Sequence, residues 1–261
     1  MKKLILVALV VPLTLAWAQS PFDGTWKADL SKLKFPEKPD VFVLKDGRYK
    51  CPTCIPTKID VAADGQDQKV TGNPYIDTLS VKVEDPKTVQ IIAKKDGKVI
   101  GNEKDVVSED GNHFTSDWTG RNAPDSPEMS VKAVHTRVAK GPEGSHALSG
   151  SWRTEKATDA SESISTVTFK GTGNGLEMSA PNGVSYSAKF DGKDYPFKGD
   201  PGITMVSLKR IDDHHVEETD KEKGKTVVIS DMTVAADGRT MTTVIKDKRA
   251  GTTFTVVSAK Q

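Results

Sequence analysis

Residues 184–192 read Val-Ser-Tyr-Ser-Ala-Lys-Phe-Asp-Gly, and this stretch shows the pattern that decides the fold. Its apolar side chains alternate with small or charged ones, which predicts a strand with one buried and one solvated face. The Asp-Gly pair at its end suits a tight hairpin, because glycine adopts positive φ without steric cost and aspartate tolerates it. The stretch therefore predicts antiparallel β structure.

The same pattern extends over the rest of the chain. Alternation recurs at residues 79–84, 166–170 and 253–256, and further Asp-Gly pairs begin at Asp46, Asp64, Asp96, Asp110 and Asp237. No stretch has the apolar stripe of a long amphipathic helix, and residues 154–163 are interpreted as a loop or short turn. The Gly-rich segment 171–175 lies between two expected strands and is interpreted as a hairpin loop rather than a phosphate site.

An internal repeat sets the domain organisation. Asp191-Gly192 repeats Asp64-Gly65, and at this offset 17 of the 52 residues from 64 to 115 have an identical counterpart. The segment Phe22-Asp-Gly-Thr-Trp26 likewise matches Leu148-Ser-Gly-Ser-Trp152. We therefore expect one module over residues 19–140, a Gly- and Pro-containing linker over 141–146, and a second module over 147–261.

Each module has room for about eight strands, and a sheet of that size usually hides its edges by closing on itself. The sequence therefore predicts an all-β protein with two tandem antiparallel up-and-down β-barrels. A β-sandwich is the alternative, because it satisfies the same alternation and turn pattern.

The first 18 residues have the pattern of a signal peptide. Lys2 and Lys3 precede an apolar run over residues 4–15, and Ala16-Trp17-Ala18 supplies small residues for cleavage. We expect export to the periplasm or the medium, and no transmembrane segment in the mature chain. The formal charge of +1 becomes about −1 once the signal is removed, which gives no electrostatic basis for binding nucleic acid.

Gly24-Thr-Trp26 and Gly150-Ser-Trp152 open the two modules. A Gly-x-Trp at the start of the first strand resembles the lipocalin-like, or calycin-like, signature, in which the Trp packs across one end of the barrel. Nearly the whole mature chain resembles secreted proteins of soil bacteria with tandem lipocalin-like domains, on the stretches 191–201, 216–221 and 236–242. This resemblance implies a fold and export, and brings no activity with it. Trp26, Trp152 and Trp118 are expected to be core residues.

Cys51-Pro-Thr-Cys54 is the most specific motif, and it permits three interpretations. Export to an oxidising compartment favours a structural disulfide between Cys51 and Cys54. A redox pair would place the first Cys at a helix N-terminus, and a zinc site would need two further ligands. The second module has no counterpart of this motif.

No residue set predicts a catalytic centre, a metal site or a cofactor. His214-His215 is interpreted as part of a solvated turn, because neighbouring strand residues point to opposite faces and so do not readily bind one ion. His113, His135 and His146 show no ligand spacing, and no Gly-x-Ser-x-Gly element is present in the sequence. We therefore expect a non-enzymatic protein.

Two function classes follow from the expected barrels. Small barrels either enclose a ligand cavity or are filled by their own side chains. The first hypothesis is an exported module that binds a small hydrophobic molecule inside one or both barrels. The alternative is an envelope or extracellular structural or interaction protein with filled barrels and no small ligand. A redox or metal function at Cys51 and Cys54 is a third hypothesis.

Overall fold

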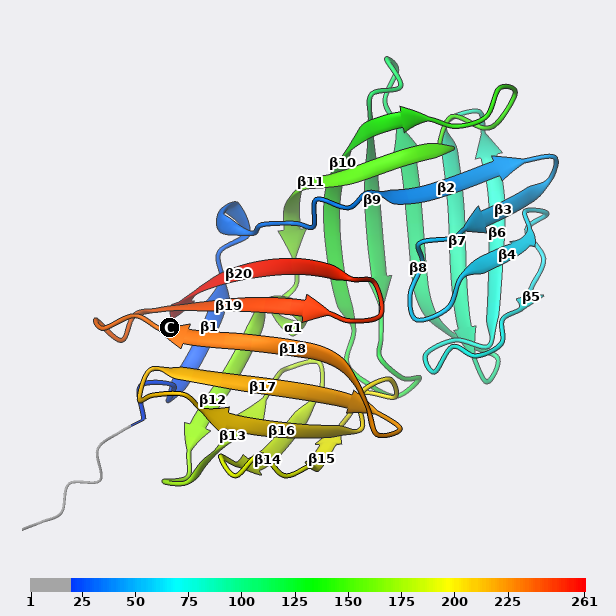
Figure 1. Cartoon of the computed structure of the whole chain (residues 1–261). Coiled ribbons are helices and arrows are strands. Elements are labelled where there is room, and N and C mark those ends of the chain that lie inside the picture. The colour runs from blue at the N-terminus through cyan, green and yellow to red at the C-terminus, as the bar shows by residue number, and fades with distance from the viewer. Residues whose placement is uncertain (1–19) are drawn as a thin grey trace, which may run out of the picture.

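The structure is a computed structural model that describes residues 20–261, so the signal peptide expected over residues 1–18 lies outside the described residues. Over this range the chain forms two antiparallel sheets of ten strands each, one closed into a barrel and the other nearly closed (Figure 1). The all-β class and the two barrels are thereby confirmed. The expected eight strands per module were too few, because short strands such as Gln68–Lys69 carry too few residues to show alternation.

The N-terminal barrel contains the strands that follow one another from residue 40 to residue 160. They are β2 (Asp40–Lys45), β3 (Arg48–Cys51), β4 (Ile59–Ala62), β5 (Gln68–Lys69), β6 (Thr78–Asp85), β7 (Thr88–Lys95), β8 (Lys98–Val107), β9 (His113–Gly120), β10 (Met129–Lys140) and β11 (Gly150–Ala160). Their order in the sheet is β4-β3-β2-β11-β10-β9-β8-β7-β6-β5, and contacts between β4 and β6 nearly close it.

The C-terminal barrel is fully closed and includes a strand from the start of the described chain. It consists of β1 (Gly24–Ala28), β12 (Thr166–Gly171), β13 (Gly175–Ser179), β14 (Ser185–Lys189), β15 (Tyr195–Lys198), β16 (Met205–Arg210), β17 (His215–Glu222), β18 (Lys225–Val234), β19 (Thr240–Asp247) and β20 (Thr252–Lys260). The short helices η1 (Leu30–Lys32) and α1 (Glu162–Ser165) lie where the chain passes between the barrels.

Because of the position of β1, the two barrels do not have the same boundaries as the two sequence repeats. β1 pairs with β12 on one side and with β20 on the other, whereas β11 pairs with β10 and β2. The N-terminal barrel is therefore a continuous insertion between the first two strands of the C-terminal barrel. This differs from the expected division into 19–140, a linker at 141–146, and 147–261. Residues 141–146 instead connect the paired strands β10 and β11 within one sheet.

The far half of β11 explains another difference from the sequence interpretation. Residues 154–160 were expected to form a loop or short turn, but they continue the strand along β10. β2 reaches only the first residues of β11, at Gly150 to Trp152. The remainder of the strand is covered on one edge only and keeps mostly polar side chains, so the alternation that reveals a strand is missing there.

Trp26 and Trp152 are core anchors, each in the barrel that its strand completes. Both side chains are 0% exposed, with Trp26 in the C-terminal core and Trp152 in the N-terminal core. Each indole Nε1 donates a hydrogen bond of 2.8 Å to the carbonyl oxygen four residues earlier, that of Phe22 or of Leu148. The predicted core role of the two Gly-x-Trp motifs agrees with this packing.

The residues that the two repeats share mostly fix turns and strand edges. Lys94 pairs with Asp67 at 2.7 Å, and the equivalent Lys221 pairs with Asp194 at 2.6 Å. Asp96 and Lys223 occupy the same hairpin position with φ of 50° and 49°, and each precedes a glycine that also has positive φ. Such turns match the twist of the flanking strands. The repeat therefore preserves hairpin geometry and a few core residues, among them the pairs Val89/Val216 and Val107/Val234.

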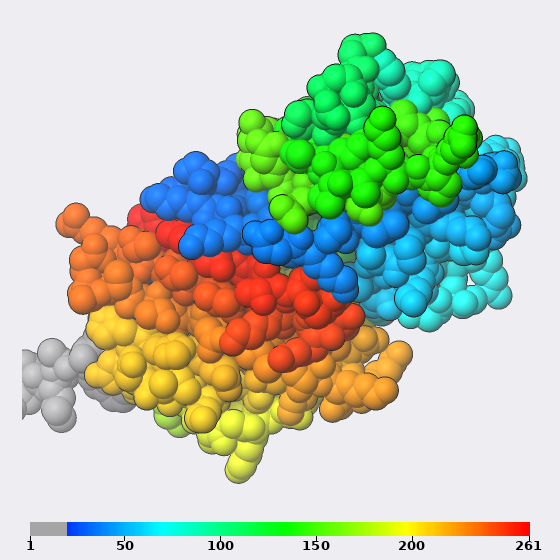
Figure 2. Space-filling model, turned by 45° about the horizontal axis from the view of Figure 1, so that its top comes forward, coloured from blue at the N-terminus to red at the C-terminus, as the bar shows by residue number. Residues whose placement is uncertain are grey.

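The barrels contact each other through loops and through the segment that follows β1. Tyr75 Oη donates a 2.8 Å hydrogen bond to Asp200 Oδ1, and Lys34 forms an isolated β-bridge with Thr255. Phe35 packs against Phe254 with ring centroids 5.3 Å apart. In Figure 2 the N-terminal segment, in blue, lies against the C-terminal strands, in red.

The insertion makes a specific prediction for Trp26→Ala. Removing a fully buried Trp costs about 3–5 kcal/mol, and we expect the loss in the C-terminal barrel although residue 26 precedes the N-terminal one. Hydrogen exchange should show reduced protection of β12 and β20 amides, with β6 to β9 unaffected. Trp152→Ala is the control and should have the reverse effect. Faster exchange in β6 to β9 of Trp26→Ala would contradict this strand arrangement.

Candidate functional site

The interior of the C-terminal barrel contains a cavity of about 210 Å³. Strands β1, β12, β13 and β17 to β20 contribute to its wall, together with α1. The lining residues are Ala28, Ile164, Ser165, Thr166, Val167, Phe169, Met178, Glu218, Ser230, Met232, Met241, Thr243, Ile245, Val256 and Ser258. The cavity is thus mainly apolar, with several hydroxyl groups and one carboxyl group.

Side chains close the barrel on one side of this cavity. Phe22, Trp26, Leu176 and Val216 are at most 1% exposed and belong to one core cluster. On the other side, α1 supplies Ile164 and Ser165 to the cavity wall, and Ile164 is 45% exposed. A lining residue that also reaches solvent marks the place where the cavity meets the surface, so the entrance lies beside α1.

Glu218 is the ionisable group of the cavity wall. It lies on β17 with Asp220 two residues further on, and because strand residues alternate in direction, both face the barrel interior. Glu218 is 8% exposed and Asp220 5%. Tyr186 Oη, on β14, donates a hydrogen bond to Glu218 Oε2. Neither carboxyl group forms an ion pair within residues 20–261.

Burial determines the protonation of this pair. Burial, together with the neighbouring Glu218, raises the pKa of Asp220 to about 9. Burial also raises the pKa of Glu218, while hydrogen bonds from Tyr186 and Asp220 act against that rise. Asp220 therefore keeps its proton at neutral pH, and Glu218 accepts the hydrogen bond from Tyr186.

The N-terminal barrel also buries acidic side chains, at different positions. Glu103 and Asp105 face inward from β8, whereas the equivalent positions of the C-terminal barrel hold Ser230 and Met232. Burial raises the pKa of Glu103 to about 7 and that of Asp105 well above its ordinary value. Asp105 is 3% exposed, and its Oδ1 has no hydrogen-bond partner among the described residues.

His135 lies in the same interior, held between two hydroxyl groups. Its Nε2 is 3.0 Å from Ser116 Oγ and its Nδ1 is 3.1 Å from Thr154 Oγ1. The ring stacks on Phe114 with centroids 4.1 Å apart. Burial lowers the pKa of His135 to about 4, so it is neutral at physiological pH and adds no positive charge near the acidic residues.

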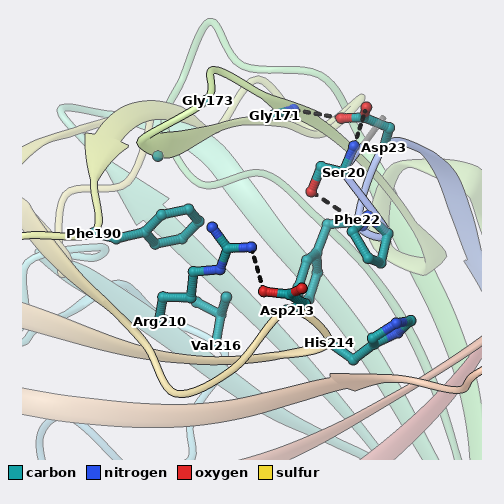
Figure 3. A pocket seen from close by; sticks show the side chains of 12 residues that line it. Ser20, Phe22, Asp23, Gly171, Gly173, Phe190, Arg210, Asp213, His214 and Val216 are labelled. Atoms are coloured by element: carbon teal, nitrogen blue, oxygen red, sulfur yellow. Dashed lines mark hydrogen bonds and ion pairs between the residues drawn. The ribbon is translucent and has the colours of Figure 1, made fainter. Parts of the chain in front are cut away.

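A second pocket, of about 600 Å³, lies at the closed end of the C-terminal barrel (Figure 3). Arg210 would be its anion-binding group, but Arg210 Nη2 is 2.7 Å from Asp213 Oδ1 and is therefore already neutralised. Asp23 accepts hydrogen bonds from the backbone N–H groups of Ser20 and Gly171, so it holds the loops together. The polar groups of this pocket mostly satisfy one another, and we regard the interior cavity as the better candidate.

The structure accounts for the residues singled out in the sequence. Cys51 and Cys54 form a disulfide, as the first of the three interpretations predicted, and Cys51 is 1% exposed in the N-terminal core. His214 lines the end pocket, while His215 begins β17 with Nε2 3.6 Å from Asp231 Oδ1. Among the described residues, no group of three or more His, Cys, Asp or Glu is arranged to hold a metal ion. Trp118 is half-buried and packs over Gly120.

The sequence analysis missed Glu218, Asp220 and Tyr186. A signal was present, because Val216, Glu218 and Asp220 occupy alternate positions of one strand, and Val216 is apolar. Two carboxyl groups on the face that also carries a core valine predict buried acids. Their contact with Tyr186, on β14, depends on how the barrel closes.

No helix within residues 20–261 is long and apolar enough to cross a membrane. Comparisons of the chain with protein-family models, with curated proteins and with solved structures found no match.

The raised pKa of Asp220 predicts a pH-dependent stability. Unfolded Asp loses its proton near pH 4, whereas folded Asp220 keeps it up to about pH 9, so the folded state loses stability as pH rises through this window. Asp220→Asn keeps a hydrogen-bond donor and removes the titration. We expect it to raise Tm at pH 7 by roughly 3 °C or more, with little change at pH 4.

Asp231→Asn is the matched control. The hydrogen bond from Lys246 lowers the pKa of Asp231, so its carboxylate stabilises the folded state above pH 4, and the substitution should lower Tm at pH 7. Thermal unfolding followed by circular dichroism measures both variants. An Asp220→Asn effect that is the same at pH 4 and pH 7 would contradict the buried, protonated state of Asp220.

Proposed function

We propose that this protein is an exported binding protein, not an enzyme, and that it holds a small, mainly apolar molecule inside the C-terminal barrel. The observation that carries the proposal is the cavity of about 210 Å³ within a closed barrel. The cavity opens to solvent beside α1, and its wall is mainly apolar with a few polar groups. Concave sites of this kind are the usual places where proteins bind small molecules.

The size and lining of the cavity indicate the class of ligand. An apolar cavity of about 150 Å³ can hold benzene, so this one suits a single-ring or short-chain molecule. Met178, Met232 and Met241 contribute three flexible thioether side chains to the wall, and methionine adapts its shape to different apolar partners. Glu218 and the hydroxyl groups would then orient a polar end of the ligand.

Export is part of the proposal and rests on separate observations. The first 18 residues have the signal-peptide pattern. The Cys51–Cys54 disulfide fits an oxidising compartment such as the periplasm or the medium. The resemblance to secreted proteins with tandem lipocalin-like domains is consistent with a carrier located there.

Methionine methyl NMR tests occupancy of the cavity. Toluene added to the protein labelled at methionine methyl groups should shift the signals of Met178, Met232 and Met241, which line the cavity. Met129, on β10 of the N-terminal barrel, should not respond. Unchanged spectra with every small probe would leave the filled-barrel hypothesis, in which the protein acts through its surface.

A cavity-filling variant provides the second test. Thr243 lines the cavity, and Thr243→Phe should abolish the toluene-dependent shifts while costing little stability, because the ring enters empty space. Thr242→Phe is the control on the opposite face of β19 and should bind toluene like the original protein. If the interior is solid, overpacking by Thr243→Phe costs about 1–3 kcal/mol instead.

A further inference from the structure

The buried acidic pair lacks a counterion within the protein. Glu218 lines the cavity, and neither Glu218 nor Asp220 forms an ion pair among the described residues. The basic group that acts on the pKa of Asp220 is Arg249, whose Nη2 is 2.7 Å from Asp247 Oδ2. A buried charge is expensive unless it is paired. The two carboxyl groups therefore have no cationic partner among the described residues, and Glu218 is the one that a ligand in the cavity would touch.

Further polar atoms around the pair lack partners. Asp220 Oδ1 and the hydroxyl oxygen of Thr166, which lines the cavity, are buried without a hydrogen bond in the described part of the chain. Tyr186 Oη donates to Glu218 Oε2, and Glu218 lies on the cavity wall, so its carboxyl group is the acceptor that a ligand in the cavity can reach. A ligand that brings hydrogen-bond donors and a positive charge satisfies this arrangement, whereas an anionic ligand would be repelled.

The buried carboxyl groups of the two barrels do not occupy equivalent positions of the sequence repeat. The inward-facing pair of the N-terminal barrel, Glu103 and Asp105, lies on β8, whereas Glu218 and Asp220 lie on β17. The counterparts of Glu218 and Asp220 in the first repeat are Ile91 and Ala93, which are apolar. Since neither pair matches a carboxyl group in the other copy, hairpin geometry does not require them.

We propose that the C-terminal barrel selects a small apolar amine, with its ammonium group on Glu218 and its hydrocarbon part among Met178, Met232 and Met241. This inference rests on the proposed function, since it names the chemical class of the molecule that the same cavity holds. The size of the cavity limits the hydrocarbon part of the ligand to about one ring or a short chain. The carboxyl group of Glu218 binds the basic nitrogen.

Three probes of nearly equal size separate the contributions of charge and shape. Benzylamine, benzyl alcohol and toluene are titrated at pH 7 against the methionine-labelled protein, and dissociation constants are obtained from the methyl shifts of the three cavity methionines. Benzylamine should bind at least about tenfold more tightly than benzyl alcohol, because a charge-assisted hydrogen bond in a buried site is stronger than a neutral one. Phenylacetate, which carries a negative charge, should not bind.

Glu218→Gln removes the charge and keeps the shape. It should abolish the preference for benzylamine while leaving toluene binding within about twofold. Glu217→Gln is the matched control, because Glu217 is adjacent on β17 and faces the outside of the barrel. It should keep the preference unchanged.

The outcomes separate this inference from the proposed function. If benzyl alcohol and toluene bind as tightly as benzylamine, the amine inference is overturned and the binding function stands. If benzylamine is preferred equally by Glu218→Gln, Glu218 is not the recognising group. If no probe shifts the cavity methionines, both proposals fail. The comparison of probes on the original protein needs no variant, so a folding defect in Glu218→Gln cannot obscure it.

Discussion

The hydrogen bonds of β1 to both β12 and β20 close the C-terminal barrel, and the interior of that barrel depends on them. Without β1, two strand edges would expose unpaired N–H and C=O groups, which attract other chains. The same strand brings Trp26 into the core, where it is 0% exposed. The segment β1 thus pairs with both neighbouring strands to close the barrel and places Trp26 in the core. Through Ala28 it also forms part of the cavity wall.

Closure also changes the electrostatics of the interior. A carboxyl group on an open sheet would be hydrated, but Glu218 and Asp220 are enclosed by the barrel, and burial is the largest cause of their raised pKa values. The hydrogen bond from Tyr186, on β14, opposes the rise in the pKa of Glu218. The closed barrel wall therefore raises the pKa of Glu218, the carboxyl group that lines the cavity.

The sequence was a good guide to local structure and to barrel formation, but not to which strand closes which barrel. Alternation at residues 184–190 and the Asp-Gly turns predicted the strands and hairpins, because both depend on neighbouring residues. The repeat did not reveal that β1 joins the C-terminal sheet, since Gly24-Thr-Trp26 and Gly150-Ser-Trp152 start equivalent strands whichever barrel each completes. The candidate site was missed for a related reason. Glu218 and Tyr186 are 32 residues apart, and only the closed barrel brings them together.

The insertion of one barrel into another has a consequence for the order in which the chain acquires its structure. As synthesis proceeds from the N-terminus, the N-terminal barrel has all of its strands once β11 has been made, at residue 160. β1 is made earlier still, yet its partner β20 ends at Lys260. The first described strand can therefore pair with β12 early but with β20 only when nearly the whole chain has been made. The C-terminal barrel, and with it the cavity, is complete only once the two ends of the described chain have met.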